Sequence, residues 1–134
     1  MTVSPLVAVF NSSPDTIEML RVVLQHAGFV VASAFTYQLR DGIVDVASFM
    51  KQHQPDVVIY DVAPPYDANW ALFLRLRQNP ALCDCQFVVT STNAGYVQQL
   101  AGRDQRVYEI IGKPLDLDNI VRATKEALRS RPTS

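Results

Sequence analysis

The sequence predicts one α/β domain built on a doubly wound, five-stranded parallel sheet. Two observations carry this prediction. Short, continuous apolar runs alternate along the chain with segments of helical periodicity, and the length of 134 residues suits a single domain. Because strands that alternate with helices are joined by βαβ crossovers, we expect parallel strands with helices on both faces of the sheet.

Five short, mostly apolar runs are expected to form strands, at residues 6–10, 29–32, 57–60, 87–90 and 108–111. The continuous runs 6–10 and 57–60 are expected to be buried. Helices are expected at residues 14–27, 46–53, 70–76, 93–100 and 117–128. Ser13 and Pro14 are typical of a helix start, and Gly28 is typical of a helix stop. The stretch 35–42 is polar and lacks a clear period, so it is expected to be irregular.

Charge and composition exclude several classes of protein. The net charge is −1 and only 19% of the residues are charged, so the chain lacks the basic arm of a nucleic-acid binder and the polybasic patch of a membrane binder. No run approaches the roughly 18 apolar residues of a membrane span, and the run 6–10 is too short for a signal peptide. Cys83 and Cys85 are read as reduced thiols. Reduced thiols indicate a cytoplasmic location. The domain is expected to span residues 1–129, followed by a disordered tail or the start of a linker at 130–134.

Polar side chains that could handle an anion follow four of the expected strands. In parallel sheets, binding sites lie beyond the carboxyl ends of the strands, where the strand order reverses. A carboxylate there can act as a nucleophile, while an ammonium group and hydroxyls can hold phosphoryl oxygens. The residues at these positions are Asn11 and Ser12, then Asp61, then Ser91 and Thr92, then Lys113.

Several segments in register resemble the receiver domain of response regulators, the phosphoacceptor module of two-component signalling. They are the segment IGKPLDLD at 111–118, PDVVIYD at 55–61, Pro65 four residues after Asp61, and WALFLRLRQNP at 70–80. The spacings from Asp61 to Ser91 and from Ser91 to Lys113 also match. The resemblance covers residues 6–128 and implies a flavodoxin-like (βα)5 fold with strand order 2-1-3-4-5.

The resemblance assigns a role to each matching position. Asp61 matches the phosphoacceptor, Lys113 matches the lysine that pairs with phosphoryl oxygens, and Ser91 and Thr92 fall at the positions that contact the phosphoryl group and signal its presence. The family holds Mg²⁺ with an acidic pair after the first strand, the phosphoacceptor and the carbonyl two residues beyond it, here Ala63. No catalytic residue and no enzymatic activity are expected.

The sequence departs from the family at three places. The acidic pair is replaced by Asn11 and Ser12, which lowers the ligand charge from about −3 to about −1, so a weakened Mg²⁺ site and no other cofactor are expected. The aromatic switch position holds Ile110, which has no ring to move. The stretch 33–45 is longer than usual and is expected to reshape the second helix.

These departures favour a degenerate receiver that is weakly phosphorylated or not phosphorylated and acts through protein contacts, with Asp61 and Lys113 as a relic ion pair. One alternative is a conventional receiver that is switched by Mg²⁺-dependent phosphorylation of Asp61. A second is a flavodoxin-like flavin or nucleotide binder, although no GxGxxG turn or P-loop is present. The expected partner is a sensor histidine kinase or another signalling protein, with no nucleic acid or membrane. A homodimer is expected through the face of the fourth helix, fifth strand and fifth helix, which includes Tyr96, Leu100, Tyr108 and residues of the last helix.

Overall fold

A computed structural model describes residues 4–82, 84–104 and 106–130 of the chain. The strands are β1 (Leu6–Asn11), β2 (Val30–Phe35), β3 (Val57–Asp61), β4 (Gln86–Ser91) and β5 (Val107–Gly112). The α-helices are α1 (Pro14–His26), α2 (Thr36–Arg40), α3 (Val46–His53), α4 (Tyr66–Arg77), α5 (Ala94–Ala101) and α6 (Leu117–Ser130), with a 3₁₀ turn at Pro80–Leu82.

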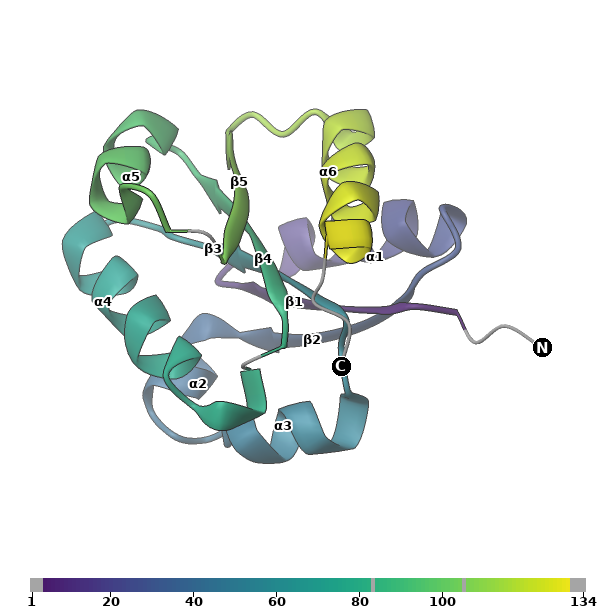
Figure 1. Cartoon of the computed structure of the whole chain (residues 1–134), viewed down its shortest axis with the longest axis horizontal. Helices are drawn as coiled ribbons and strands as arrows, with labels where there is room; N and C mark the ends of the chain where they lie inside the picture. Colours follow the sequence, from purple (N-terminus) through teal and green to yellow (C-terminus); the bar gives the residue numbers. More distant parts are fainter. Residues whose placement is uncertain (1–3, 83, 105, 131–134) are drawn as a thin grey trace.

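The five strands form one sheet in the order β2-β1-β3-β4-β5, and every neighbouring pair is parallel. Helices α1 and α6 cover one face, and α2, α3, α4 and α5 cover the other (Figure 1). The predicted fold class and the strand order 2-1-3-4-5 are therefore confirmed. The order reverses between β1 and β3, which are neighbours, so the predicted binding edge lies where these two strands end.

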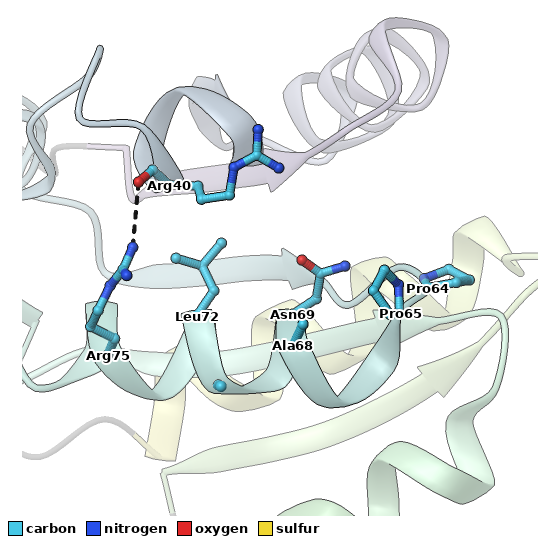
Figure 2. Close-up of a pocket in the computed structure, with 8 residues that line it drawn as sticks. Arg40, Pro64, Pro65, Ala68, Asn69, Leu72 and Arg75 are labelled. Carbon is cyan, nitrogen blue, oxygen red and sulfur yellow. Dashed lines mark hydrogen bonds between the residues drawn. The ribbon is translucent and has the colours of Figure 1, made fainter.

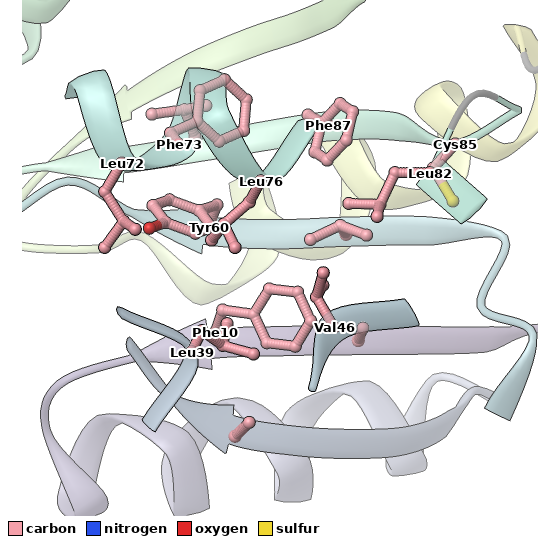
Figure 3. Close-up of a cluster of buried hydrophobic side chains, with 14 of the residues drawn as sticks. Phe10, Leu39, Val46, Tyr60, Leu72, Phe73, Leu76, Leu82, Cys85 and Phe87 are labelled. Carbon is pink, nitrogen blue, oxygen red and sulfur yellow. The ribbon is translucent and has the colours of Figure 1, made fainter. Parts of the chain in front are cut away.

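Successive residues of each strand fill two separate cores, because side chains along a strand point alternately to opposite faces. In β3, Val57 and Ile59 pack under α1 and α6, whereas Val58 and Tyr60 pack under α2 to α5. The second core is rich in aromatic rings. Phe73 of α4 lies 5.0 Å from Tyr60 and 5.1 Å from Phe87, measured between ring centroids (Figure 3). The continuous apolar strands in the sequence follow from burial on both faces.

The ends of α1 follow the predicted capping chemistry. The Ser13 side chain accepts a hydrogen bond from the backbone N–H of Thr16, and Pro14 occupies the first helical position. Gly28 has a φ of +99°, a left-handed conformation that glycine adopts without strain. The Ser13 cap and Gly28 thus mark the two ends of α1, and β2 begins shortly after Gly28, at Val30.

The expectation that residues 35–42 are irregular is wrong, because Thr36–Arg40 forms α2. The Gln38 side chain accepts a hydrogen bond from the Phe35 N–H, and Leu39 is 5% exposed in the core. A helix of five residues with one buried side chain is too short to show the apolar periodicity by which a helix is identified in a sequence. The predicted helix at 70–76 also starts earlier, at Tyr66.

The predicted tail at 130–134 starts one residue too early, because Ser130 is the last residue of α6. Residues 131–134 lie outside the described residues, as does Cys83. Cys85 is buried, and its thiol donates to the Pro55 carbonyl at 3.4 Å. Among the helices of the described ranges, none has the length and apolarity needed to cross a membrane.

We expect Phe73→Ala to lower the free energy of unfolding by about 3–5 kcal/mol, because it leaves a cavity among Tyr60, Trp70 and Phe87. Urea denaturation measures this change. The matched control is Val22→Ala on the exposed side of α1, where Val22 is 56% exposed and the change should stay within about 0.5 kcal/mol. Equal losses in the two variants would contradict the packing described for this core.

Candidate phosphoacceptor site

The predicted site residues from β1 and β3 lie at the same edge of the sheet. Asn11 ends β1 and Asp61 ends β3, and these strands pair directly. Asn11 is 1% exposed and Asp61 is 4% exposed. A charged group with so little contact with water needs partners, because burial of an unpaired carboxylate is very unfavourable.

Lys113 and Thr90 supply these partners. The Lys113 ammonium lies 2.9 Å from Oδ1 of Asp61, and the Lys113 side chain remains 25% exposed. The Thr90 hydroxyl donates a hydrogen bond of 2.6 Å to the same oxygen. The expected Asp61–Lys113 ion pair is therefore present, and the Thr90 hydroxyl, which the sequence does not single out, adds a further donor to Asp61.

Thr90 reaches Asp61 because the two residues are paired in the register of β3 and β4. Side chains of paired residues in parallel strands project to the same face, here the face covered by α1 and α6. Alternate residues of β3 and β4 pack in one core, with Ile59 and Val88 placed there, but the sequence does not give the register that sets Thr90 beside Asp61. In the sequence alone, Thr90 is only the last residue of an expected strand.

Ser91, the next residue, points to the opposite face. Its hydroxyl donates to the Val62 carbonyl at 2.8 Å and accepts from the N–H of Asn93 at 3.2 Å. The Asn93 side chain in turn caps α5 by accepting from the N–H of Tyr96. The Ser91 hydroxyl thus joins the end of β3 to the start of α5, and among the described residues it makes no hydrogen bond to Asp61.

The oxygens at the family's Mg²⁺ positions are poor metal ligands in this chain. Oδ1 of Asn11 is neutral and accepts from the N–H of Ser13 at 2.9 Å. Ser12 is exposed and offers only a hydroxyl. The Ala63 carbonyl accepts from the side-chain amide of Asn69 at 2.6 Å.

These residues do not fit Mg²⁺, which prefers carboxylates in near-ideal octahedral geometry. The single carboxylate, Asp61, is already neutralised by Lys113. Within residues 4–82, 84–104 and 106–130, no group of three or more His, Cys, Asp or Glu side chains could hold a metal ion.

Two tyrosines link the starts of α4 and α5 above this edge. The Tyr66 hydroxyl lies 2.6 Å from the Thr92 hydroxyl, and the Tyr96 hydroxyl donates to the Asp67 carboxylate at 2.7 Å. The two rings meet edge to face, with centroids 6.1 Å apart. We call these four residues the tyrosine clasp. Thr92, expected to contact a phosphoryl group, is exposed and belongs to this clasp.

Ile110, at the position of the family's aromatic switch, is partly buried and packs against the core under α2 to α5. The isoleucine side chain has no polar group that could hydrogen-bond to Ser91. It also has no aromatic ring that could rotate from the core to solvent. An aromatic contact between α4 and α5 is made by Tyr66 and Tyr96 of the clasp.

A cleft of about 490 Å³ borders the site on the side of α2 and α4. Figure 2 shows Asn69 beside Pro65 at the start of α4, facing this cleft, with Arg40 of α2 across it. Arg75 donates to the Arg40 carbonyl at 3.4 Å and ties α2 to α4. The connection between β2 and β3 thus forms one wall of this cleft through Arg40.

We expect Lys113→Met to destabilise the fold by about 1–3 kcal/mol, because it leaves the Asp61 carboxylate without its counter-charge. Combining it with Asp61→Asn should restore most of that loss, since a neutral amide needs no counter-charge. Chemical denaturation of the single and double variants measures this coupling. Lys125→Met, on the exposed side of α6, is the control; a loss no larger than that of the control would contradict the ion pair.

The clasp predicts a shift in the ionisation of Tyr96. The hydrogen bond to Asp67 and the carboxylate's charge raise the pKa of Tyr96, because both favour the neutral phenol. We expect Asp67→Asn to move this ionisation to lower pH, as read by ultraviolet absorbance during a pH titration. Tyr96→Phe identifies the signal, and the effect of Asp67→Asn must disappear in that background.

Comparisons with known proteins agree with this arrangement. No family model matches the chain. An uncharacterised response regulatory protein of Staphylococcus epidermidis is 30% identical over 101 residues, which cover 73% of this chain and 38% of that protein. The transcriptional regulatory protein HptR of Staphylococcus aureus is 31% identical over 80 residues, or 60% of this chain and 30% of that protein. The chain thus spans well under half the length of these relatives.

Solved structures match the whole fold. A response regulator from Thermotoga maritima superimposes with a TM-score of 0.75 at 22% identity, covering 96% of this chain and 100% of that one. The chemotaxis protein CheY4 of Vibrio cholerae gives a TM-score of 0.73 at 16% identity, covering 93% and 99%. The response regulator TrrA of Thermotoga maritima, solved in complex with Mg²⁺ and BeF, gives 0.69 at 17% identity, covering 92% and 98%.

At these identities the structural matches establish the fold, and the curated relatives connect the sequence to response regulators. The site adds the ion pair of Asp61 and Lys113 at the expected edge of the sheet. The chain has the receiver-domain fold and is related to the response regulators of two-component signalling.

Proposed function

We propose that this chain is a receiver-type signalling module in which Asp61 is weakly phosphorylated or not phosphorylated, and which acts through contacts with other proteins. One observation carries the proposal. The acceptor carboxylate is buried and neutralised by Lys113 and Thr90, while the positions that should bring a metal hold Asn11 and Ser12.

The electrostatic argument concerns the charge of the incoming phosphoryl group. Phosphoryl transfer needs positive charge around the equatorial oxygens, and metal ions normally supply much of it. Lys113 carries one positive charge, and that charge already balances Asp61. Phosphorylation would convert the Asp61 carboxylate, with a charge of −1, into an acyl phosphate with a charge of about −2, which adds about one negative charge to this edge without a second cation to balance it.

The surface proposed for protein contacts is the face of α5, β5 and α6. Tyr96 and Tyr108 are each 36% exposed there. Arg122 pairs with Glu109 of β5 and Glu126 of α6, and Tyr108 donates to Glu126 at 2.8 Å. This mixture of aromatic rings and paired charges suits a protein partner better than a nucleic acid. The proposed partners are a sensor histidine kinase, another signalling protein or a second copy of the chain, in the cytoplasm, and no catalytic activity is assigned.

A conventional receiver switched by phosphorylation of Asp61 is the second candidate. The contact between Asp61 and Lys113 at 2.9 Å favours it, because the same two residues would hold a phosphoryl group. The two candidates differ in whether the acceptor reacts when Mg²⁺ and a phosphodonor are abundant.

Intact-mass measurement after incubation with acetyl phosphate and Mg²⁺ separates the candidates. We expect no phosphoryl adduct on this chain, whereas a conventional receiver in the same mixture should carry one. Asp61→Asn is the matched control, because it removes the acceptor and keeps a side chain of the same size. An adduct on the natural chain that is absent from Asp61→Asn would overturn the proposal and establish the second candidate.

A further inference from the structure

We propose that the cleft between α2 and α4 is a second protein-binding surface, which takes a short, extended segment of a partner that carries acidic side chains. This inference rests on the protein contacts of the proposed function and does not depend on whether Asp61 is phosphorylated. The cleft has a volume of about 490 Å³ and lies between Arg40 of α2 and the surface of α4 that faces it (Figure 2).

The described residues that line this cleft carry two positive charges and no carboxylate. The charges belong to Arg40 and Arg75, whose side chains are exposed. In the part of the chain that the structure describes, Arg75 forms no salt bridge, and its guanidinium donates a hydrogen bond of 3.4 Å to the Arg40 carbonyl. Because a guanidinium has several N–H donors, Arg75 can still bind a carboxylate of a partner.

Arg40 is also available, although it pairs with its neighbour Asp41 at 2.9 Å. The two side chains are 56% and 48% exposed, and an ion pair in contact with water contributes little because solvent screens it. Figure 2 shows the two guanidinium groups apart from each other, with that of Arg75 near the last turn of α4 and that of Arg40 further toward the start of this helix. A partner that carries more than one carboxylate can therefore contact both arginines.

The floor of the cleft suits an extended chain. Ala68 and Ala71 lie one turn apart on α4, Pro64 and Pro65 precede this helix, and all four are exposed. Small side chains let another backbone come close to the helix. The helix rises about 15 Å between Pro65 and Arg75, at about 1.5 Å per residue, which corresponds to about five residues of extended chain.

Asn69 offers a hydrogen-bond acceptor to the backbone of such a segment. Its side-chain nitrogen donates to the Ala63 carbonyl at 2.6 Å, and among the described residues no donor bonds to its Oδ1. Figure 2 shows the amide group of Asn69 projecting from α4 on the side of the cleft. The N–H groups of an extended peptide are donors that this oxygen can accept from.

A protein segment fits these features better than a small molecule or a nucleic acid. Sites for small molecules enclose most of the ligand surface, whereas the floor of this cleft is exposed along α4. A nucleic acid requires many cations for its phosphates, and the cleft has two, in a chain with a net charge of −1. Two separate arginines above an apolar floor match acidic side chains that alternate with apolar ones.

The probe for the experiment is the peptide acetyl-LELEL-amide. In extended form its two glutamates lie on one side, about 7 Å apart. Binding to the natural chain is followed by the chemical shifts of backbone amides in ¹H–¹⁵N NMR spectra. We expect shifts that saturate with peptide concentration and that concentrate on Arg40 and on residues 68–75. The peptide acetyl-LQLQL-amide has the same shape without the charges, so it should bind at least about tenfold more weakly.

Arg40→Gln/Arg75→Gln tests the two charges. We expect it to weaken the binding of acetyl-LELEL-amide at least about tenfold, since the loss of one charge-assisted hydrogen bond corresponds to about that ratio. The matched control is Arg103→Gln, in the connection between α5 and β5, because Arg103 is exposed and forms no salt bridge with another described residue. This control should bind the peptide as the natural chain does.

Ala71→Glu tests the same site without removing an arginine. The new carboxylate stands one turn before Arg75, where it can form an ion pair on the helix surface. We expect it to occupy the guanidinium and repel the peptide, so that binding is lost while the NMR spectrum remains that of a folded chain.

Equal affinity for the two peptides, or equal affinity of the natural chain and Arg40→Gln/Arg75→Gln for acetyl-LELEL-amide, would overturn the inference. The absence of shifts at the cleft would overturn it as well. Shifts confined to α5, β5 and α6 would overturn it and support the other surface of the proposed function. Sodium glutamate that gives the same shifts at the same concentration would show a site for small anions instead. A phosphoryl adduct on Asp61 would overturn the proposed function and leave these binding results unchanged.

Discussion

The edge of the sheet is organised around one constraint, the burial of the Asp61 carboxylate. A carboxylate that is 4% exposed needs a counter-charge and hydrogen-bond donors close to it. Lys113 provides the charge from the end of β5, and Thr90 provides a donor from β4. These partners come from strands that follow β3 in the sheet, so the position of the carboxylate depends on correct pairing of β3, β4 and β5.

The same pairing divides the polar residues between two faces. Asp61 and Thr90 share the face covered by α1 and α6, whereas Ser91 bonds to Val62 and leads through Asn93 to α5. Asp61 and Ser91 therefore belong to different hydrogen-bond networks. The Ser91 network links the end of β3 to the start of α5, and the tyrosine clasp links the start of α5 to the start of α4.

Much of this arrangement could be predicted from the sequence. Short apolar runs located all five strands, and the runs of β1 and β3 are continuous because these two strands are buried on both faces. Asp61 and Lys113 could be paired because both follow strands that end at the same edge. Thr90 could not be assigned without the register of β3 and β4, since a threonine in a buried strand reads as a core residue. Asn69 and the short helix α2 depend on hydrogen bonds between loops and helices, which leave no periodic pattern in the sequence.

The side chains around Asp61 show how this edge is stabilised with a single carboxylate. Asn11 and Ser12 carry no charge, so no carboxylate at the end of β1 repels Asp61. Lys113 contacts Asp61 directly at 2.9 Å, and the pair is electrically neutral. Asn11 then serves the local backbone by accepting from Ser13. Asn11 and Asp61 thus each have a structural role inside the domain. Asn11 organises the turn that leads into α1, whereas Asp61, through Thr90 and Lys113, joins β3 to β4 and to the end of β5.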